Sequence, residues 1–185
     1  MKVLITGATG LIGNELIDQC LSKNYEIHYL TTQHNHQNKH SNITAFYWNP
    51  EKQIIDLECF KGVDVVINLA GASVSKRWTK SYKNEILNSR VMGASLLVNS
   101  IKQLPSHQIQ QVISASAIGI YPHHLDKVYN DSHIDVSDSF LGSVVQQWEQ
   151  SVSRFSEINI PVCILRIGLV LSLQGGALPV TALPI

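Results

Sequence analysis

Three glycines near the N-terminus could bind a negatively charged phosphate group. Gly7, Gly10 and Gly13 have the spacing G-x-x-G-x-x-G, a variant of the G-x-G-x-x-G spacing of dinucleotide-binding turns. Gly7 would allow a tight turn, Gly10 would let a pyrophosphate approach the backbone, and Gly13 would let a helix pack close to the preceding strand. The alternative is an ordinary glycine-rich turn between a strand and a helix, and the flanking elements decide between the two.

A buried strand precedes these glycines and an amphipathic helix follows them. Residues 3–5 are all aliphatic with no alternation, which is typical of a strand covered on both faces. From Leu11 the period becomes helical, because Ile12, Leu16 and Cys20 share one stripe. The free N–H groups and the positive dipole end of that helix would face the glycine turn. This order of elements favours an anion site.

Strands and helices alternate along the rest of the chain. We expect further strands at residues 26–31, 44–48, 64–69, 111–116 and 161–167, helices at 79–103 and 140–158, a weak helix or turn at 53–60, and loops at 33–42 and 121–139. This alternation predicts an α/β fold, a doubly wound parallel sheet of the Rossmann type with strand order 3-2-1-4-5-6. We expect residues 1–171 to form the dinucleotide-binding domain and residues 172–185 to begin a C-terminal substrate region.

The composition excludes several classes of protein. Lys+Arg and Asp+Glu number 14 each, so no net basic field favours nucleic acid, and no Lys/Arg cluster suggests an anionic membrane. The three cysteines are far apart, which argues against a disulfide framework and a zinc site, and we expect all of them in the core. No apolar run is long enough to span a membrane and no signal peptide is recognisable, so the expected location is cytoplasmic.

Several motifs together resemble a known family. The segments 6–13 and 66–71, and Ser114-Ala115-Ser116 followed by Tyr121, resemble the extended short-chain dehydrogenase/reductases. Finer matches resemble the atypical group called nucleoside-diphosphate-sugar epimerase-like, and they lie at residues 68–73, 76–78, 88–91, 148–149, 165–171 and 175–178. The resemblance covers the whole chain. Members of this family continue with a C-terminal substrate domain, so we expect Ile185 to mark a truncation, of the gene or of the polypeptide as expressed.

The resemblance implies a dinucleotide site at three strand ends. It assigns the pyrophosphate to Gly7, Thr9, Gly10, Leu11 and Ile12, the adenine-side ribose and nicotinamide half to Leu69, Ala70 and Gly71, and the side of the nicotinamide to Ser114. Gly13 belongs to the cofactor-binding residues through the close packing of the helix on the strand.

The identity of the nucleotide depends on the residues after the second strand. Thr31-Thr32-Gln33-His34 contains no acid that would repel a 2′-phosphate, although the arginine expected in this family is also missing. Thr32 could bind the phosphate, and Lys39 or a loop histidine could supply charge. We therefore favour NADP(H) over NAD(H). His34 and His36 read as a solvated loop and not as a metal site, because no carboxylate or cysteine accompanies them.

The usual catalytic pair of this superfamily is missing. Ordinary members use a Tyr-x-x-x-Lys pair, and the extended type has a glutamate four residues after the lysine. If Glu149 is that glutamate, the lysine position holds Val145 and the tyrosine position holds Leu141, and neither can transfer a proton. Ser116 and Tyr121 remain as catalytic candidates, although a serine at a strand end is more often structural.

Three residues could contact a substrate. Arg77 and Trp78 follow the fourth strand at the expected mouth of the site, where Trp78 could stack on a ring or simply cover the core. Arg90 could bind a substrate anion or form a salt bridge on its helix. The function that the resemblance implies is an NAD(P)-binding epimerase-like or oxidoreductase-like protein that acts on a small molecule, such as a nucleotide sugar. The alternative is a non-catalytic NADP(H) sensor or partner-binding module. By analogy, the helix at residues 79–103 could form a homodimer interface.

Overall fold

The fold is built on one mixed sheet. The computed structural model describes residues 1–34, 40–176 and 178 of the chain. The sheet has seven strands in the order β4-β3-β2-β1-β5-β6-β7. Its parallel strands are β1 (Lys2–Thr6), β2 (Glu26–Thr31), β3 (Ile43–Asn49), β5 (Val65–Asn68), β6 (Gln111–Ala117) and β7 (Val162–Ile167). The expected order 3-2-1-4-5-6 is confirmed for these six strands.

The seventh strand, β4, corrects one expectation. The weak helix or turn expected at residues 53–60 is wrong in its first part, because Ile54–Ile55 forms β4 and pairs antiparallel with β3. A short 3-10 turn, Leu57–Phe60, follows it. A strand of two residues is too short to show a hydrophobic period in the sequence. Its pairing with β3 therefore appears only in the folded structure.

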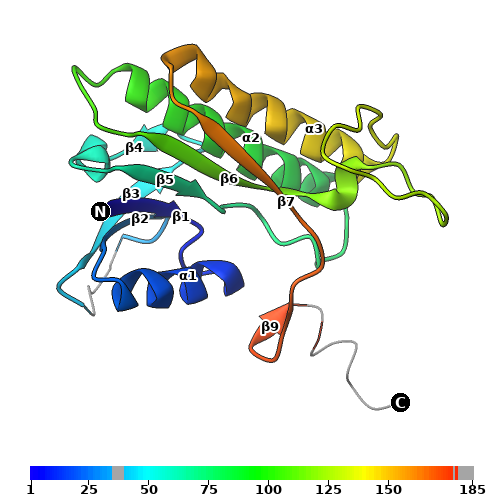
Figure 1. The fold of residues 1–185 in the computed structure, drawn as a ribbon, viewed down its shortest axis with the longest axis horizontal. Coiled ribbons are helices and arrows are strands. Elements are labelled where there is room, and N and C mark those ends of the chain that lie inside the picture. Colours follow the sequence, from blue (N-terminus) through cyan, green and yellow to red (C-terminus); the bar gives the residue numbers. More distant parts are fainter. Residues whose placement is uncertain (35–39, 177, 179–185) are drawn as a thin grey trace.

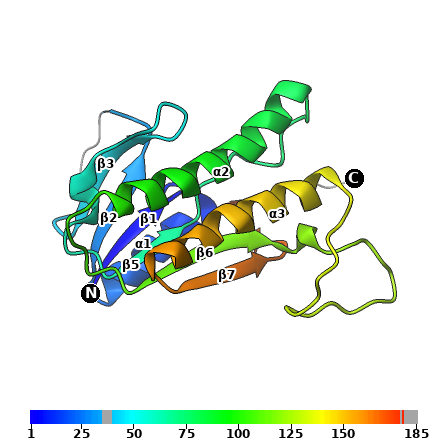
Figure 2. The same cartoon turned by 90° about the horizontal axis from the view of Figure 1, so that it is seen from above.

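Helices cover both faces of the sheet. Helices α2 (Lys80–Lys102) and α3 (Phe140–Ser153) pack against each other on one face, and α1 (Leu11–Ser22) lies on the other (Figures 1 and 2). The helix expected at residues 140–158 continues beyond α3 as a 3-10 turn, Arg154–Ile158.

Two apolar clusters hold these layers together. Leu4 and Val66 belong to the larger cluster, between the sheet and α2 and α3, whereas Val3, Ile5 and Ile27 belong to a smaller one on the face of α1. Strand β1 is therefore buried on both faces, which explains its unbroken aliphatic sequence. Its carboxyl end, and the glycine turn that follows, are fixed by this central position.

The last described segment is a small hairpin. Strands β8 (Leu171–Ser172) and β9 (Gly175–Gly176) pair antiparallel, and this hairpin was not expected. Residues 177 and 179–185 lie outside the described part of the chain, so the division into two regions near residue 172 stays a prediction. Residues 121–139 contain no helix or strand, as expected for a loop, and the last of them, Ser139, caps α3. In the described part of the chain, no helix is long and apolar enough to cross a membrane.

The cysteines differ in burial. Cys20 and Cys59 are buried, as expected for core residues, whereas Cys163 on β7 is only partly buried. The expectation of a core position is therefore wrong in degree for Cys163, because β7 is the edge strand and no other strand of the described residues pairs with its free side.

Candidate functional site

The glycine turn has a geometry that only glycine allows at two positions. Gly7 has a φ of +70°, and a Cβ atom there would lie 2.8 Å from the carbonyl carbon of Leu69. A Cβ atom on Gly13 would lie 2.2 Å from the carbonyl oxygen of Gly7. Gly10 closes the turn, because its N–H donates to that same oxygen at 3.0 Å. The start of α1 is therefore pressed against the end of β1.

Helix α1 begins without a side-chain cap. Thr79 accepts a hydrogen bond from the N–H of Tyr82 at the start of α2, and Ser139 accepts one from Gly142 at the start of α3. Gly10, in the same position before α1, has no side chain that could do this, and no acidic residue lies in the first turn. The first N–H groups of a helix have no partner within the helix, so an anion could take the place of the cap.

A cavity of about 690 Å³ lies beside this helix start. The residues that line it come from four segments: the glycine turn (Gly7, Gly10, Leu11, Ile12, Gly13), the end of β5 and the connection after it (Leu69, Ser73, Val74, Ser75), β6 (Ala115), and the segment after β7 (Leu169, Val170, Gly176). Ile12, expected on the buried stripe of α1, is 38% exposed and faces this cavity. The structure thus gathers most of the predicted pyrophosphate residues and Leu69 at one cavity.

Three buried polar side chains fix the strand ends beneath the cavity. Thr6, Asn68 and Ser114 stand opposite one another in the parallel register of β1, β5 and β6. The Thr6 hydroxyl donates to Asn68 Oδ1 at 2.8 Å, and Asn68 Nδ2 donates to Ser114 Oγ at 3.0 Å. The Thr6 hydroxyl also accepts hydrogen bonds from the N–H groups of Leu69 and Ala70. This row of side chains therefore positions the backbone at residues 69–70, and Ser114 is fully buried within it.

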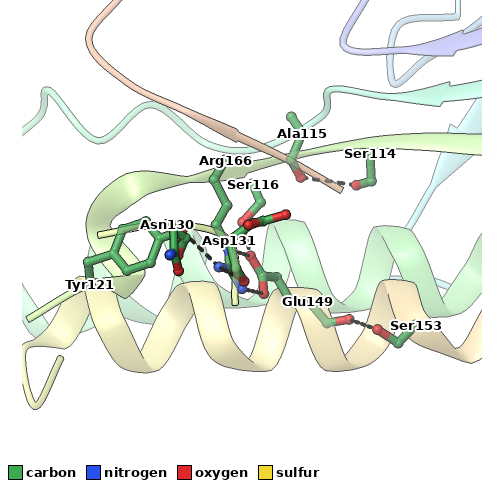
Figure 3. A network of polar contacts seen from close by, with 9 residues as sticks. All are labelled: Ser114, Ala115, Ser116, Tyr121, Asn130, Asp131, Glu149, Ser153 and Arg166. Carbon is green, nitrogen blue, oxygen red and sulfur yellow. Dashed lines mark hydrogen bonds and ion pairs between the residues drawn. The ribbon is translucent and has the colours of Figure 1, made fainter. Parts of the chain in front are cut away.

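The two catalytic candidates meet in a different place. The Ser116 hydroxyl donates to Glu149 Oε1 at 2.5 Å, and Arg166 binds both oxygens of the same carboxylate at 2.9 Å (Figure 3). Arg166 also donates to the Tyr121 hydroxyl at 2.9 Å, and that hydroxyl donates to the carbonyl of Asn130. Residues from β6, α3, β7 and the loop at 121–139 are joined in this network.

The network is electrostatically matched. Burial, the largest single influence, raises the pKa of the Glu149 carboxyl, but the hydrogen bonds from Arg166 and Ser116 and the charge of Arg166 together bring it below its ordinary value. Hydrogen bonds to Glu149 and Tyr121 raise the pKa of the Arg166 guanidinium. Both groups are therefore charged at neutral pH.

The network lies apart from the residues that line the cavity. Ala115 lines the cavity, whereas its neighbour Ser116 is 3% exposed and bonded to Glu149 on the side of α3. Leu141 and Val145, at the expected tyrosine and lysine positions, are apolar, and Val145 is buried. The cavity walls in the described part of the chain thus offer no tyrosine or lysine side chain.

Arg90 takes a role that was not expected. Its guanidinium donates to the carbonyls of Ala72 and Ile86, and it lies 5.1 Å from the ring centre of Trp148. A Cβ atom on Gly71 would lie 2.9 Å from the guanidinium carbon. Arg90 therefore clamps the connection after β5, and among the described residues no carboxylate pairs with it. Burial lowers the pKa of this guanidinium.

Four other predicted contact residues, Arg77, Trp78, Thr31 and Thr32, do not line this cavity. Trp78 is 38% exposed, donates to the carbonyl of Val74 and packs edge-to-face on Phe140, while Arg77 is exposed. Thr31 accepts a hydrogen bond from the N–H of Gln33, and Thr32 is exposed beside it.

The histidine loop is only partly described. His34 stacks on Tyr47 with ring centres 3.9 Å apart. His36 and Lys39 lie outside the described residues. Within the described ranges, no group of three or more histidine, cysteine or acidic side chains could hold a metal ion.

The pairing of Glu149 with Arg166 was not foreseen. Both residues stood within motifs of the family resemblance, but nothing in their separation of 17 positions indicates that they meet. Their contact depends on how α3 docks against β7, which is a property of the packed fold.

Comparison with known proteins identifies a family that matches this chain and solved structures that share its fold. A family model described as the NAD dependent epimerase/dehydratase family matches residues 3–172. An epimerase family protein of Staphylococcus saprophyticus is 39% identical over 184 residues, and one of Staphylococcus epidermidis is 35% identical over 186 residues. The chain spans 59% and 60% of the length of these two relatives.

Solved structures show the same fold. A nucleoside-diphosphate sugar epimerase from Corynebacterium glutamicum superposes with a TM-score of 0.80 at 28% identity, covering 98% of this chain and 36% of that one. A human epimerase family protein with NADPH gives 0.76 at 22% identity, covering 98% and 58%. A UDP-glucuronic acid 4-epimerase from Bacillus cereus with NAD gives 0.76 at 19% identity, covering 96% and 60%.

The strand order and the glycine turn between β1 and α1 define a Rossmann-type α/β protein. Because the family model covers most of its length, the chain belongs to the NAD dependent epimerase/dehydratase family.

Proposed function

We propose that this chain binds a dinucleotide with its pyrophosphate on the start of α1. The observation that carries the proposal is the glycine turn, in which a Cβ atom on Gly13 would collide with the Gly7 carbonyl and Gly10 leaves the helix uncapped. An extended diphosphate could accept hydrogen bonds from the N–H groups that this turn leaves free. The cavity of about 690 Å³ beside the turn supports the same assignment.

We favour NADP(H) as the dinucleotide. The residues at the end of β2, from Thr31 to His34, include no carboxylate that would bind the 2′-hydroxyl of NAD and repel the 2′-phosphate of NADP. Thr32 is exposed at this point and could donate to a phosphate. Solved structures of the same fold contain NADPH in a human epimerase family protein and NAD in a UDP-glucuronic acid 4-epimerase, so the preference rests on the residues at the end of β2.

The substrate in this proposal is a small molecule of the nucleotide-sugar type, as the names of two solved structures of the same fold suggest. We assign its entrance to Arg77 and Trp78, which follow the cavity-lining residues 73–75, and to the segment that Arg90 clamps. Ser116 and Tyr121 are the catalytic candidates, and they would act only if their network with Glu149 and Arg166 opened toward the cavity.

A second candidate function is a cofactor-binding protein without catalysis. Leu141 and Val145 favour it, because neither side chain can carry a proton. The Ser116 hydroxyl is buried and already donates its hydrogen bond to Glu149, which also favours a function without catalysis. Turnover of a nucleotide sugar or carbonyl compound, using the chain together with any residues that follow it in the gene, would distinguish the two functions.

Isothermal titration with NADPH and NADH tests the binding proposal. We expect NADPH to bind more tightly than NADH, and Gly13→Ala to abolish binding of both. Gly119→Ala is the matched control, because among the described residues a Cβ atom there would meet only the Cβ of Leu141, at an ordinary 3.5 Å. A folded sample that binds neither nucleotide would contradict the proposal, and unchanged binding by Gly13→Ala would contradict the assigned position.

A further inference from the structure

Four cations gather on the connection between β5 and α2 and on the first turn of α2. Lys76, Arg77, Lys80 and Lys83 supply four of the 14 basic residues within eight positions. No run of basic residues stands out here in the sequence, because polar and aromatic residues interrupt them. The first three are exposed and Lys83 is partly exposed. No carboxylate of a described residue lies within 4.0 Å of any of the four. We call these four residues the cationic rim.

The cationic rim is held in place by its neighbours. The Tyr82 hydroxyl donates to the carbonyl of Ser73 at 2.6 Å, which ties the start of α2 to the segment before it. The ammonium group of Lys76 lies 5.3 Å from the ring centre of Tyr82, and that of Lys83 lies 5.0 Å from the ring centre of Phe140. These contacts hold two of the positive charges near fixed positions on the fold.

The rim adjoins the proposed cofactor cavity. Ser73, Val74 and Ser75, which immediately precede Lys76, line that cavity. The described residues that line it include no charged side chain. The phosphates of a dinucleotide would therefore meet positive charge at the edge of the cavity and neutral groups inside it. A cluster of one sign at the mouth of a cleft raises the rate at which oppositely charged ligands arrive.

We propose that the cationic rim steers phosphate-bearing dinucleotides into the cavity. The rim acts on the association step and leaves the bound complex to the glycine turn. This inference rests on the proposed dinucleotide binding. A 2′-phosphate adds about 1.5 to 2 negative charges at neutral pH, so the rim accelerates NADPH more than NADH. The end of β2 has no arginine that would favour NADP(H). The cationic rim therefore supplies part of this preference.

Stopped-flow fluorescence with NADPH and NADH, at low and at high salt, tests the proposal. The double substitution Lys76→Gln with Lys80→Gln removes two rim charges. The matched control, Lys23→Gln with Lys52→Gln, removes two charges from the far end of α1 and from the turn before β4. At low salt we expect the rim variant to bind NADPH about threefold to tenfold more slowly than the control, with an unchanged dissociation rate. At about 0.5 M salt the two variants should associate at the same rate.

Each other result overturns the inference in a distinguishable way. Equal association rates of the two variants at low salt would show that the rim does not steer. A faster dissociation with an unchanged association rate would place the lysines in contact with the bound nucleotide. Binding of NADPH at high salt keeps the proposed function intact in both cases. Absence of NADPH binding by the unsubstituted protein would remove the proposed function and this inference together.

Discussion

Replacement of Glu149 by glutamine should destabilise the protein in a pH-dependent way. The carboxylate accepts hydrogen bonds from Ser116 and from two nitrogens of Arg166, and the side chains of Glu149 and Arg166 are 14% and 22% exposed. Glutamine preserves the shape but turns an N–H₂ group toward one of these donors. The Arg166 guanidinium then remains partly buried without a counter-charge.

The size of the effect follows from this geometry. A hydrogen bond to a charged group contributes about 1.5 to 3 kcal/mol, and the several bonds here are not additive because they share one carboxylate. Arg166 keeps some contact with water, which reduces the cost of leaving it unpaired. We therefore expect the free energy of unfolding to fall by about 2 to 3 kcal/mol at pH 7, or a melting temperature lower by roughly 5 to 10 °C.

The sign of the pH dependence is fixed by the lowered pKa of Glu149. A carboxyl group whose pKa is lower in the folded state stabilises the fold above its unfolded pKa, about 4.3, and this stabilisation is lost as the pH falls through the folded value. Urea unfolding at pH 7 and near pH 3.5 should therefore show a large difference between Glu149→Gln and the unsubstituted protein at pH 7 and a smaller one in acid. The double variant with Arg166→Gln should lose less than the sum of the single variants. A difference below about 0.5 kcal/mol at pH 7, or one that does not change with pH, would refute this reasoning.

Two further predictions concern buried polar groups. Thr6→Val removes the hydroxyl that bonds Asn68 and two backbone N–H groups. We expect the free energy of unfolding in urea to fall by about 2 kcal/mol and NADPH to bind more weakly in a titration. An unchanged free energy of unfolding would contradict the expected loss of stability. Burial lowers the pKa of His28, whose Nδ1 bonds the Cys59 carbonyl. The unfolded chain therefore takes up protons more readily below about pH 6.5, and the free energy of unfolding falls as the pH falls. His28→Asn should reduce this fall between pH 7.5 and 5, and an unchanged slope would show that other groups cause it.

The elements of the site follow from the sequence where one local pattern specifies them. The glycine spacing, the aliphatic β1 and the alternating strands and helices predict the turn at residues 7–13 and the order of six strands. Strand β4 was missed because two residues carry no period, and its existence depends on the partner strand β3.

The polar network could not be predicted in the same way. Ser116, Glu149 and Arg166 come from β6, α3 and β7, and their distances depend on the docking of a helix on a sheet. Arg90 was expected to face a ligand or a salt bridge, and it instead binds carbonyls beside Gly71. Arg90 fits there because Gly71, a residue of the connection after β5, has no Cβ atom. The hydrophobic period of a sequence gives no information about such a contact between two segments.

The most direct test of the central proposal is the backbone amide spectrum of the protein titrated with NADPH. If the pyrophosphate lies on the start of α1, the largest shifts should fall on Gly10, Leu11, Ile12 and Gly13, with a second group at residues 69–71. Residues at the far end of α1, such as Lys23, should shift little. Saturation with NADPH that leaves the amides of residues 10–13 unchanged would contradict the account, whatever the affinity.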